Sequence, residues 1–366
     1  MQRTQPPFRA DHVGSLLRPP ALKAAREKRA RGEIGAEALK AVEDREIERV
    51  IRAQEQAGLQ SITDGEFRRS WWHLDFLWGL NGIEKHIAEG GVAFAGVNTR
   101  SEGVKVTGRI DANGHPMLEH FRFVKAHTGR TPKMTIPAPS ALYGRPVAVP
   151  VDRKVYPTNE QMLADLGQAY RKVVRAFADA GCRYLQLDEV FIAMLCDEKY
   201  RAKMRERGDD PRKLGELYAG LINTAVSDIP PGMAVTMHMC RGNYKSTYMG
   251  SGGYAAVEEL IFERINVHGY FMEYDDARSG GFEPLRRLPK GKTAVLGIMT
   301  TKRGELESKD ELKRRIDEAA KYRPLEQLCI SGQCGFASTE EGNSLGEAEQ
   351  WAKLRRLVEV ADEVWR

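Results

Sequence analysis

The chain has 366 residues, of which 42% are hydrophobic and 29% are charged. This composition is typical of a globular protein, and no apolar run approaches the roughly 18 residues of a membrane span. The net charge of +5 comes from basic residues scattered among acidic ones, which argues against nucleic-acid binding. The five cysteines are thinly spread, so we expect free thiols, and the N-terminal residues lack the apolar segment of a secretory signal. We therefore expect a cytoplasmic protein with neither a membrane nor a nucleic-acid partner.

Strand-like segments alternate with helical segments along the chain. The predicted strands are residues 12–16, 59–66, 133–140, 184–189, 234–240, 269–275, 293–299 and 328–334. Apolar residues recur at helical spacing before Gly58 and again over residues 158–180, which Gly181 closes. Further helices are predicted over residues 197–206, 211–228, 254–265, 308–322 and 345–365.

Eight apolar strands separated by helices indicate an α/β protein with a parallel sheet, and eight such units close naturally into a barrel. An open, doubly wound sheet is the alternative. The barrel is favoured because reactive side chains follow the carboxyl ends of the strands, where barrel enzymes place their active sites. We predict a single (β/α)8 (TIM) barrel domain over residues 1–366, with the irregular residues 67–130 as a hairpin-rich insertion after the second strand.

The segment VTMHMC places His238 and Cys240 two residues apart at the end of a predicted strand. Residues at this spacing point the same way, so an imidazole and a thiol project together, as in half of a zinc site. Glu273 and Cys334 follow later strands and are candidates for the remaining ligands. The structural alternative is that the histidine and the cysteines are packing residues and that Glu273 pairs with Arg278.

A histidine and two cysteines would leave zinc a position for a further ligand, which Glu273 could occupy until substrate displaces it. A thiol that binds zinc loses its proton at neutral pH and becomes a nucleophile. Alkyl transfer to sulfur is therefore the reaction that this ligand set predicts.

Three acidic residues, Glu66, Asp188 and Glu189, lie at the ends of apolar strands, where a buried charge needs a partner. A substrate ammonium group would supply one. The alternative is neutralisation by nearby basic residues, namely Arg68, Arg69 and Lys133. Ser15, after Gly14, could donate hydrogen bonds to a substrate carboxylate, although a Gly-Ser turn is also an ordinary strand exit.

An aromatic cluster follows the second predicted strand and comprises Trp71, Trp72, Phe76 and Trp78. It could wall a pocket for a flat ligand. Packing within the insertion, or a contact between subunits of a homo-oligomer, is the interpretation that we favour.

The segments HMC, MEYD and SGQCG, with HVGS, TDGEF and QLDE, resemble the catalytic half of cobalamin-independent methionine synthase over most of the chain. The resemblance implies a (β/α)8 barrel and a zinc ion bound by His238, Cys240, Glu273 and Cys334. It also implies that the amino and carboxylate groups of homocysteine are bound by Val13, Gly14, Ser15, Glu66 and Asp188.

The reaction implied by the resemblance is methyl transfer from a methylated pteridine, such as 5-methyltetrahydrofolate or its polyglutamate, to homocysteine, which forms methionine. The chain departs from the family near the end of the seventh strand, where GIMTTKRG lacks the Asp-x-His proton donor. Thr300, Thr301 or Lys302 would have to replace it. The methyl donor is therefore open. Transfer of an alkyl group to another small thiol, as in epoxyalkane:coenzyme M transferases, and a non-catalytic zinc-stabilised barrel are the alternatives.

Overall fold

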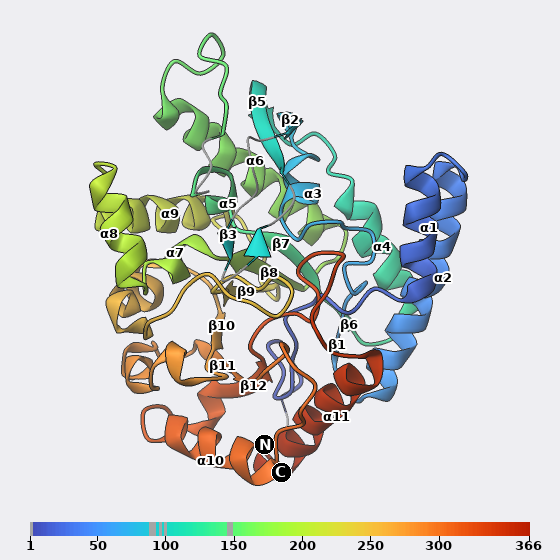
Figure 1. Ribbon diagram of the computed structural model, residues 1–366. Helices are drawn as coiled ribbons and strands as arrows, with labels where there is room; N and C mark the ends of the chain where they lie inside the picture. Colours follow the sequence, from blue (N-terminus) through green and yellow to red (C-terminus); the bar gives the residue numbers. More distant parts are fainter. Residues whose placement is uncertain (1–2, 88–92, 95–96, 99–100, 145–148) are drawn as a thin grey trace.

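A computed structural model describes residues 3–87, 93–94, 97–98, 101–144 and 149–366. Six parallel strands form its central sheet, in the order β12-β11-β10-β9-β8-β7. They are Met134–Pro137 (β7), Tyr184–Glu189 (β8), Ala234–Met239 (β9), Gly269–Glu273 (β10), Thr293–Met299 (β11) and Leu328–Gly332 (β12). Helices surround the sheet (Figure 1).

The longer helices lie between the strands in sequence or at the chain ends, and some of them occur in pairs. They are Pro20–Ala30 (α1), Ala36–Gln56 (α2), Met117–His127 (α4), Asn159–Asp179 (α6), Glu198–Glu206 (α8), Pro211–Ala225 (α9), Lys309–Ala320 (α10) and Glu347–Val364 (α11). Leu74–Leu77 (α3), Ser140–Tyr143 (α5) and Phe191–Met194 (α7) are single turns. The predicted ends of two helices are confirmed, since α2 and α6 stop just before Gly58 and Gly181. No helix in the described part of the chain combines the length and the apolar character needed to cross a membrane.

Two irregular segments continue the sheet at its edges. Ser61–Ile62 (β1) pairs in parallel with Thr131–Pro132 (β6), which directly precedes β7. At the other edge, Ala10 forms a parallel bridge with Ile330 of β12. The Thr63 hydroxyl donates to the carbonyl of Gly14 over 2.7 Å and joins these two segments. Eight segments therefore follow one another round a ring, in the order of the predicted (β/α)8 barrel.

The prediction of a regular first strand over residues 12–16 is wrong. Gly14 has a φ of +134°, which interrupts an extended strand. The amide of His12 donates to the side chain of Asp11, and the amide of Leu16 donates to the carbonyl of Gly65 over 3.0 Å. Local contacts thus replace the ladder that a strand would make.

The second predicted strand, residues 59–66, is regular only over β1. The strand does not continue because the side chain of Gln54 in α2 forms hydrogen bonds with both backbone groups of Thr63. Its Oε1 accepts from the Thr63 amide over 3.0 Å, and its Nε2 donates to the Thr63 carbonyl over 2.8 Å. The predicted helix over residues 254–265 is helical but is not one regular α-helix. It is a 3-10 turn at Tyr254–Ala256 and a π turn at Leu260–Arg264, which ends where the Asn223 amide donates to the Arg264 carbonyl.

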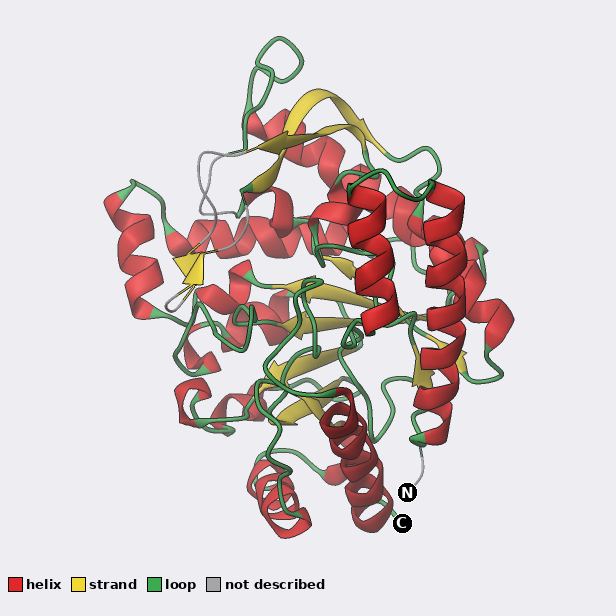
Figure 2. Ribbon diagram, turned by 45° about the vertical axis from the view of Figure 1, so that its right-hand side comes forward, coloured by secondary structure: helices red, strands yellow, loops and turns green. Residues whose placement is uncertain are grey.

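The range predicted as an insertion contains an antiparallel hairpin of Asn81–Ile87 (β2) and Glu102–Asp111 (β5). A smaller antiparallel pair joins Ala93–Phe94 (β3) to Val97–Asn98 (β4). Figure 2 shows the larger hairpin at the top of the molecule. However, α4 also falls in this range, and it packs against α2 and α6 as the helix of a βα unit. The single-domain division over residues 1–366 stays a prediction.

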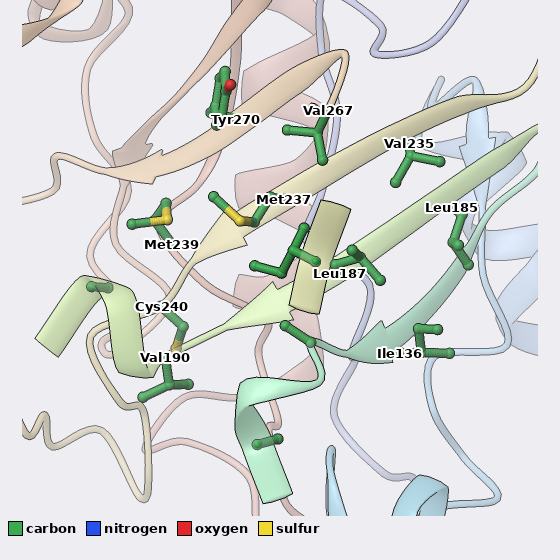
Figure 3. Close-up of a cluster of buried hydrophobic side chains, with 14 of the residues drawn as sticks. Ile136, Leu185, Leu187, Val190, Val235, Met237, Met239, Cys240, Val267 and Tyr270 are labelled. Atoms are coloured by element: carbon green, nitrogen blue, oxygen red, sulfur yellow. The ribbon is translucent and has the colours of Figure 1, made fainter. Parts of the chain in front are cut away.

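Alternate residues of each strand enter two apolar cores. One cluster fills the inside of the ring and comprises Phe8, Val13, Tyr184, Phe271, Val295 and Cys329. The other lies between the strands and the helices, and Figure 3 shows Leu185 and Leu187 of β8 beside Val235, Met237 and Met239 of β9. This alternation decides which polar residues at the strand ends point into the ring. The predicted free thiols are confirmed, since all five cysteines are buried and unpaired by disulfides.

Candidate metal centre and active site

The carboxyl ends of β8 and β9 place Asp188 and His238 side by side, because the two residues are register partners. Both follow the inward row of their strands, two residues after Gln186 and Thr236. Glu189 is next in sequence and points the opposite way. Its carboxylate accepts a hydrogen bond from the Ser140 hydroxyl and another from the amide of Ile192 over 2.8 Å.

Four side chains gather where β9, β10 and β12 end. One potential ligand atom from each of His238, Cys240, Glu273 and Cys334 lies within 4.8 Å of every other, and all four residues are buried. The two sulfur atoms are 3.7 Å apart. The structure thus brings together the four residues that the sequence proposed as metal ligands, from strands far apart in the chain.

Glu273 is held in place from two sides. One carboxylate oxygen accepts from the amide of Arg241 over 2.8 Å, and the other lies 3.2 Å from Nη2 of Arg278. The ion pair with Arg278 is the one that the structural alternative anticipated. Because a carboxylate oxygen has two lone pairs, these contacts fix the orientation of Glu273 and leave each oxygen able to accept a further bond.

The imidazole of His238 bridges two neighbours. Nε2 lies 3.0 Å from the carbonyl oxygen of Gln333, and Nδ1 lies 3.5 Å from the carboxylate of Asp188. Burial lowers the pKa of His238, but Asp188 and the nearby Cys334 and Glu273 outweigh burial and raise this pKa to about 9. A carboxylate behind a ligand histidine is the usual arrangement in metal sites, where it orients the ring.

The two thiols affect each other. Their contact raises the pKa of Cys240, an effect that burial reinforces. The same contact lowers the pKa of Cys334, as do the charge of His238 and the hydroxyl of Ser338, whose Oγ is 3.7 Å from Cys334 Sγ. Cys334 is therefore the thiol of this pair that more readily becomes a thiolate.

A cavity of about 90 Å³ adjoins the cluster. On the same measure, this volume is several times the space that one water molecule needs. Among the predicted site residues, its lining contains Val13, Ser15, Glu66, Asp188, His238, Cys240 and Cys334. A buried concave site with converging polar groups at this end of the strands is the expected place for a substrate.

Glu66 sits in a left-handed backbone conformation, with a φ of +62°, which a non-glycine residue rarely adopts. Its Oε1 accepts from the Thr135 hydroxyl over 2.9 Å and lies 3.5 Å from Arg69, whereas Oε2 is buried without a hydrogen-bond partner. Burial raises the pKa of Glu66 despite Arg69. Of the other proposed cationic neighbours, Arg68 pairs with Glu43, and Lys133 pairs with Asp11 inside the ring.

Ser15 approaches the loop that carries Cys334. Its carbonyl accepts from the amide of Phe336 over 2.9 Å. A β-carbon at Gly335 would lie 1.9 Å from Ser15 Oγ, so only glycine at this position allows the hydroxyl to sit beside the loop. The serine hydroxyl and the metal-ligand candidate thus reach the same cavity.

Gly14 does not line the cavity, and its importance is conformational. A β-carbon there would lie 2.6 Å from Thr135 Cγ2, in a backbone conformation that L residues rarely adopt. We expect Gly14→Ala to lower the free energy of unfolding by about 2–4 kcal/mol, measured by urea denaturation.

The matched control is Gly220→Ala, because nothing lies within 4 Å of a β-carbon at this helical position. It should leave stability unchanged or raise it slightly. The double change Gly14→Ala with Thr135→Ser removes the clashing methyl group and should recover part of the loss. Equal stability of Gly14→Ala and the unchanged protein would contradict the argument.

Glu189 and the three proposed proton donors lie outside the cavity lining. The Thr301 hydroxyl donates to the carbonyl of Gly335 over 3.0 Å, the Thr300 side chain accepts from the amide of Lys302, and the Lys302 ammonium pairs with Asp275. These contacts do not test the predicted roles of Thr300, Thr301, Lys302 and Glu189, which stay predictions.

The cavity also contains residues that the sequence did not single out as ligands or substrate contacts. They include Trp71, Trp72, His73, Glu102, Phe191, Asn243, Tyr244, Met249 and Ser338. The packing interpretation holds for Phe76, which is buried and stacked on His115, but Trp71 and Trp72 face the cavity. The available signal was the position of Trp71 and Trp72 just after Glu66.

A buried group of one histidine, two cysteines and a glutamate, beside a cavity at the carboxyl ends of barrel strands, defines a candidate metalloenzyme of the α/β class. The family described as "Cobalamin-independent synthase, Catalytic domain" matches residues 8–363. The chain belongs to this family, and methyltransferases of the methionine synthase type are its members.

Three relatives illustrate the similarity. The uncharacterized protein YxjH of Bacillus subtilis is 50% identical over 362 residues, covering 98% of this chain and 95% of that protein. A methionine synthase of Pyrococcus abyssi is 26% identical over 348 residues, and the matched region covers 94% of this chain and 91% of that protein. The crystal structure of a putative vitamin-B12 independent methionine synthase from Listeria monocytogenes has a TM-score of 0.80 and 39% identity, with 100% of both chains covered.

Proposed function

We propose that the protein is a zinc-dependent methyltransferase that transfers a methyl group to the thiolate of homocysteine and forms methionine. The observation that carries this proposal is that His238, Cys240 and Cys334 line a cavity that Ser15, Glu66 and Asp188 also line, while a carboxylate oxygen of Glu273 lies within 4.8 Å of the ligand atoms of the other three candidates. Membership of the methionine synthase family supports the same reaction.

The four residues fit zinc by their chemistry. Zinc accepts nitrogen, sulfur and oxygen ligands, whereas a site with two thiols is unsuited to magnesium or calcium. His238, Cys240 and Cys334 would hold the ion, and Glu273 would be the ligand that a substrate displaces. Bound zinc would take the substrate sulfur as a ligand and keep it as a thiolate at neutral pH.

The remaining residues would bind and orient the amino acid. The buried Oε2 of Glu66 has no partner of its own, so an ammonium group beside it would satisfy a charge that is costly to leave unpaired. Asp188 lines the same cavity, and the Ser15 hydroxyl with the backbone of Val13 and Gly14 would bind the carboxylate. Two acidic groups disfavour a sulfonated acceptor such as coenzyme M, since like charges repel.

Substitution of the metal by cobalt provides the test. We expect homocysteine to change the visible absorption of the cobalt-loaded protein, because its sulfur becomes a ligand, whereas methionine, which lacks a thiol, should not. A spectrum that no small thiol alters would favour a non-catalytic metal site. The cytoplasmic location and a homo-oligomeric state stay predictions.

A further inference from the structure

We propose that Arg278 is a positioning residue that receives the carboxylate of Glu273 when the substrate thiolate takes its place as a ligand. This inference rests on the proposed function, since it assigns a residue to the exchange of ligands at the same centre. It follows from the contacts of Glu273, from the way Arg278 is held, and from the position of both residues relative to the cavity.

The Glu273 carboxylate has one protein donor on each oxygen. Oε1 accepts from the amide of Arg241 over 2.8 Å, and Oε2 accepts from Nη2 of Arg278 over 3.2 Å. The amide belongs to the main chain directly after Cys240, whereas the Arg278 guanidinium carries a full positive charge from a 3-10 turn after β10. A carboxylate that gives up a ligand position in a buried site needs such a partner, because an unpaired buried charge is costly.

Arg278 is held by several groups besides Glu273. Its Nε lies 3.0 Å from the carboxylate of Asp276, and its Nη2 lies 3.2 Å from that of Asp275. Nη1 donates to the carbonyl of Gly250 over 3.4 Å, and the guanidinium lies over the ring of Tyr248, 4.5 Å from its centroid. These contacts keep the guanidinium in place when the Glu273 carboxylate moves, so the acceptor is preorganised.

The other two carboxylates near Arg278 have further means of stabilisation. Asp275 also pairs with the ammonium group of Lys302, and the side chain of Asp276 is 38% exposed, so water can solvate its charge. The side chain of Glu273 is only 2% exposed. Arg278 is the one basic side chain within ion-pair distance of Glu273 among the residues that the structure describes. The charge of Arg278 therefore matters most to Glu273.

Glu273 and Arg278 lie behind the wall of the cavity. His238, Cys240 and Cys334 line the cavity, whereas neither Glu273 nor Arg278 belongs to its lining in the described part of the chain. A small shift of the Glu273 carboxylate toward Arg278 thus leaves the cavity side to the substrate. The carboxylate oxygen leaves its ligand position as the thiolate sulfur enters it, and the proton of the thiol passes to solvent.

Arg278 therefore competes with the metal for the same carboxylate. Without the guanidinium, Glu273 should be a stronger ligand and should be harder for a thiol to displace. The affinities for zinc and for homocysteine should then change in opposite directions. A purely structural role of Arg278 would lower both affinities together.

Arg278→Gln tests this expectation with two binding measurements. Zinc affinity is measured without substrate by competition with a chromophoric chelator, and homocysteine affinity is measured from the visible absorption of the cobalt-loaded protein. We expect the Kd for homocysteine to rise at least about tenfold, as the loss of a charged hydrogen bond allows, with a Kd for zinc that is unchanged or lower. Arg278→Lys keeps the charge but not the planar fork, so it should give changes of the same direction and smaller size.

A double-variant comparison shows whether Arg278 acts through Glu273. In Glu273→Gln, a neutral amide replaces the carboxylate, and His238, Cys240 and Cys334 would still hold the metal. Adding Arg278→Gln to this variant should change the Kd for homocysteine by less than about twofold, because the group that Arg278 receives is no longer charged. An equal effect of Arg278→Gln with and without Glu273→Gln would overturn the inference, and so would a parallel loss of both affinities.

The matched control is Arg287→Gln. Arg287 also follows β10 and pairs with two carboxylates, those of Glu258 and Glu263, but it lies outside the cluster and the cavity lining. This variant should change neither affinity. A homocysteine response that Arg278→Gln leaves unaltered would defeat this inference alone, whereas an unchanged protein that responds to no thiol would defeat the proposed function.

Discussion

Serine in place of Cys240 or Cys334 should deprive the protein of its metal and of methyl transfer. A serine hydroxyl remains protonated at neutral pH and is a poor ligand for zinc, so the metal would keep only part of its coordination sphere. We expect about one zinc per chain in the unchanged protein and a loss of metal affinity of more than about 100-fold in either variant. Metal analysis after dialysis against a chelator, followed by an assay of methionine formation, measures both effects.

Cys182→Ser is the matched control. Cys182 is buried, lies outside the cluster and donates to the carbonyl of Tyr184 over 3.2 Å, a bond that a serine hydroxyl can also make. This variant should keep its zinc and its activity. A metal-free protein that still forms methionine, or full zinc content in both cluster variants, would refute the proposed metal centre.

Glu66→Gln should weaken the use of homocysteine selectively. Removing the carboxylate leaves the substrate ammonium without its buried partner, which costs about 2–4 kcal/mol and lowers kcat/KM by roughly 30-fold to 1,000-fold. The comparison substrate is 4-mercaptobutanoate, which has the thiol and the carboxylate of homocysteine but no ammonium group. Its kcat/KM should change by less than about threefold, since the contact being removed does not exist for it.

The pH dependence provides a second measurement on the same residue. Because burial raises the pKa of Glu66, its carboxylate is protonated at a higher pH than that of an exposed glutamate. The KM for homocysteine should therefore rise as the pH is lowered through this pKa, whereas the KM for 4-mercaptobutanoate should not follow it. If Glu66→Gln impaired both thiols equally, Glu66 would be a structural partner of Arg69 and Thr135.

The sequence predicted those features that depend on local periodicity. Apolar strands, helix ends at Gly58 and Gly181, and the same-side spacing of His238 and Cys240 each follow from neighbouring residues. The gathering of Glu273 and Cys334 with them followed from the parallel order of the strands, because parallel strands end at one edge of a sheet.

Features set by distant side chains could not be predicted in this way. Thr63 looks like a strand residue, yet Gln54 of α2 occupies its backbone groups. Asp188 and Glu189 are both acids at a strand end, and only the direction of the pleat in β8 decides that the first lines the cavity and the second binds Ser140. The closeness of Glu102 to Trp71 depends on the path of a hairpin that no periodicity specifies.

The backbone contacts between residues 70–72 and residues 338–340 have a consequence for synthesis of the protein on the ribosome. One part of the cavity wall emerges early, with Glu66 and Trp71, but Ser338, whose carbonyl accepts a hydrogen bond from the amide of Trp72, emerges much later. Cys334 is also synthesised late, so a nascent chain that ends before residue 334 cannot bring together all four ligand candidates. Binding of the proposed zinc ion by all four candidates would therefore be a late event in biogenesis, and zinc supplied during translation would stabilise only chains that have grown past residue 334.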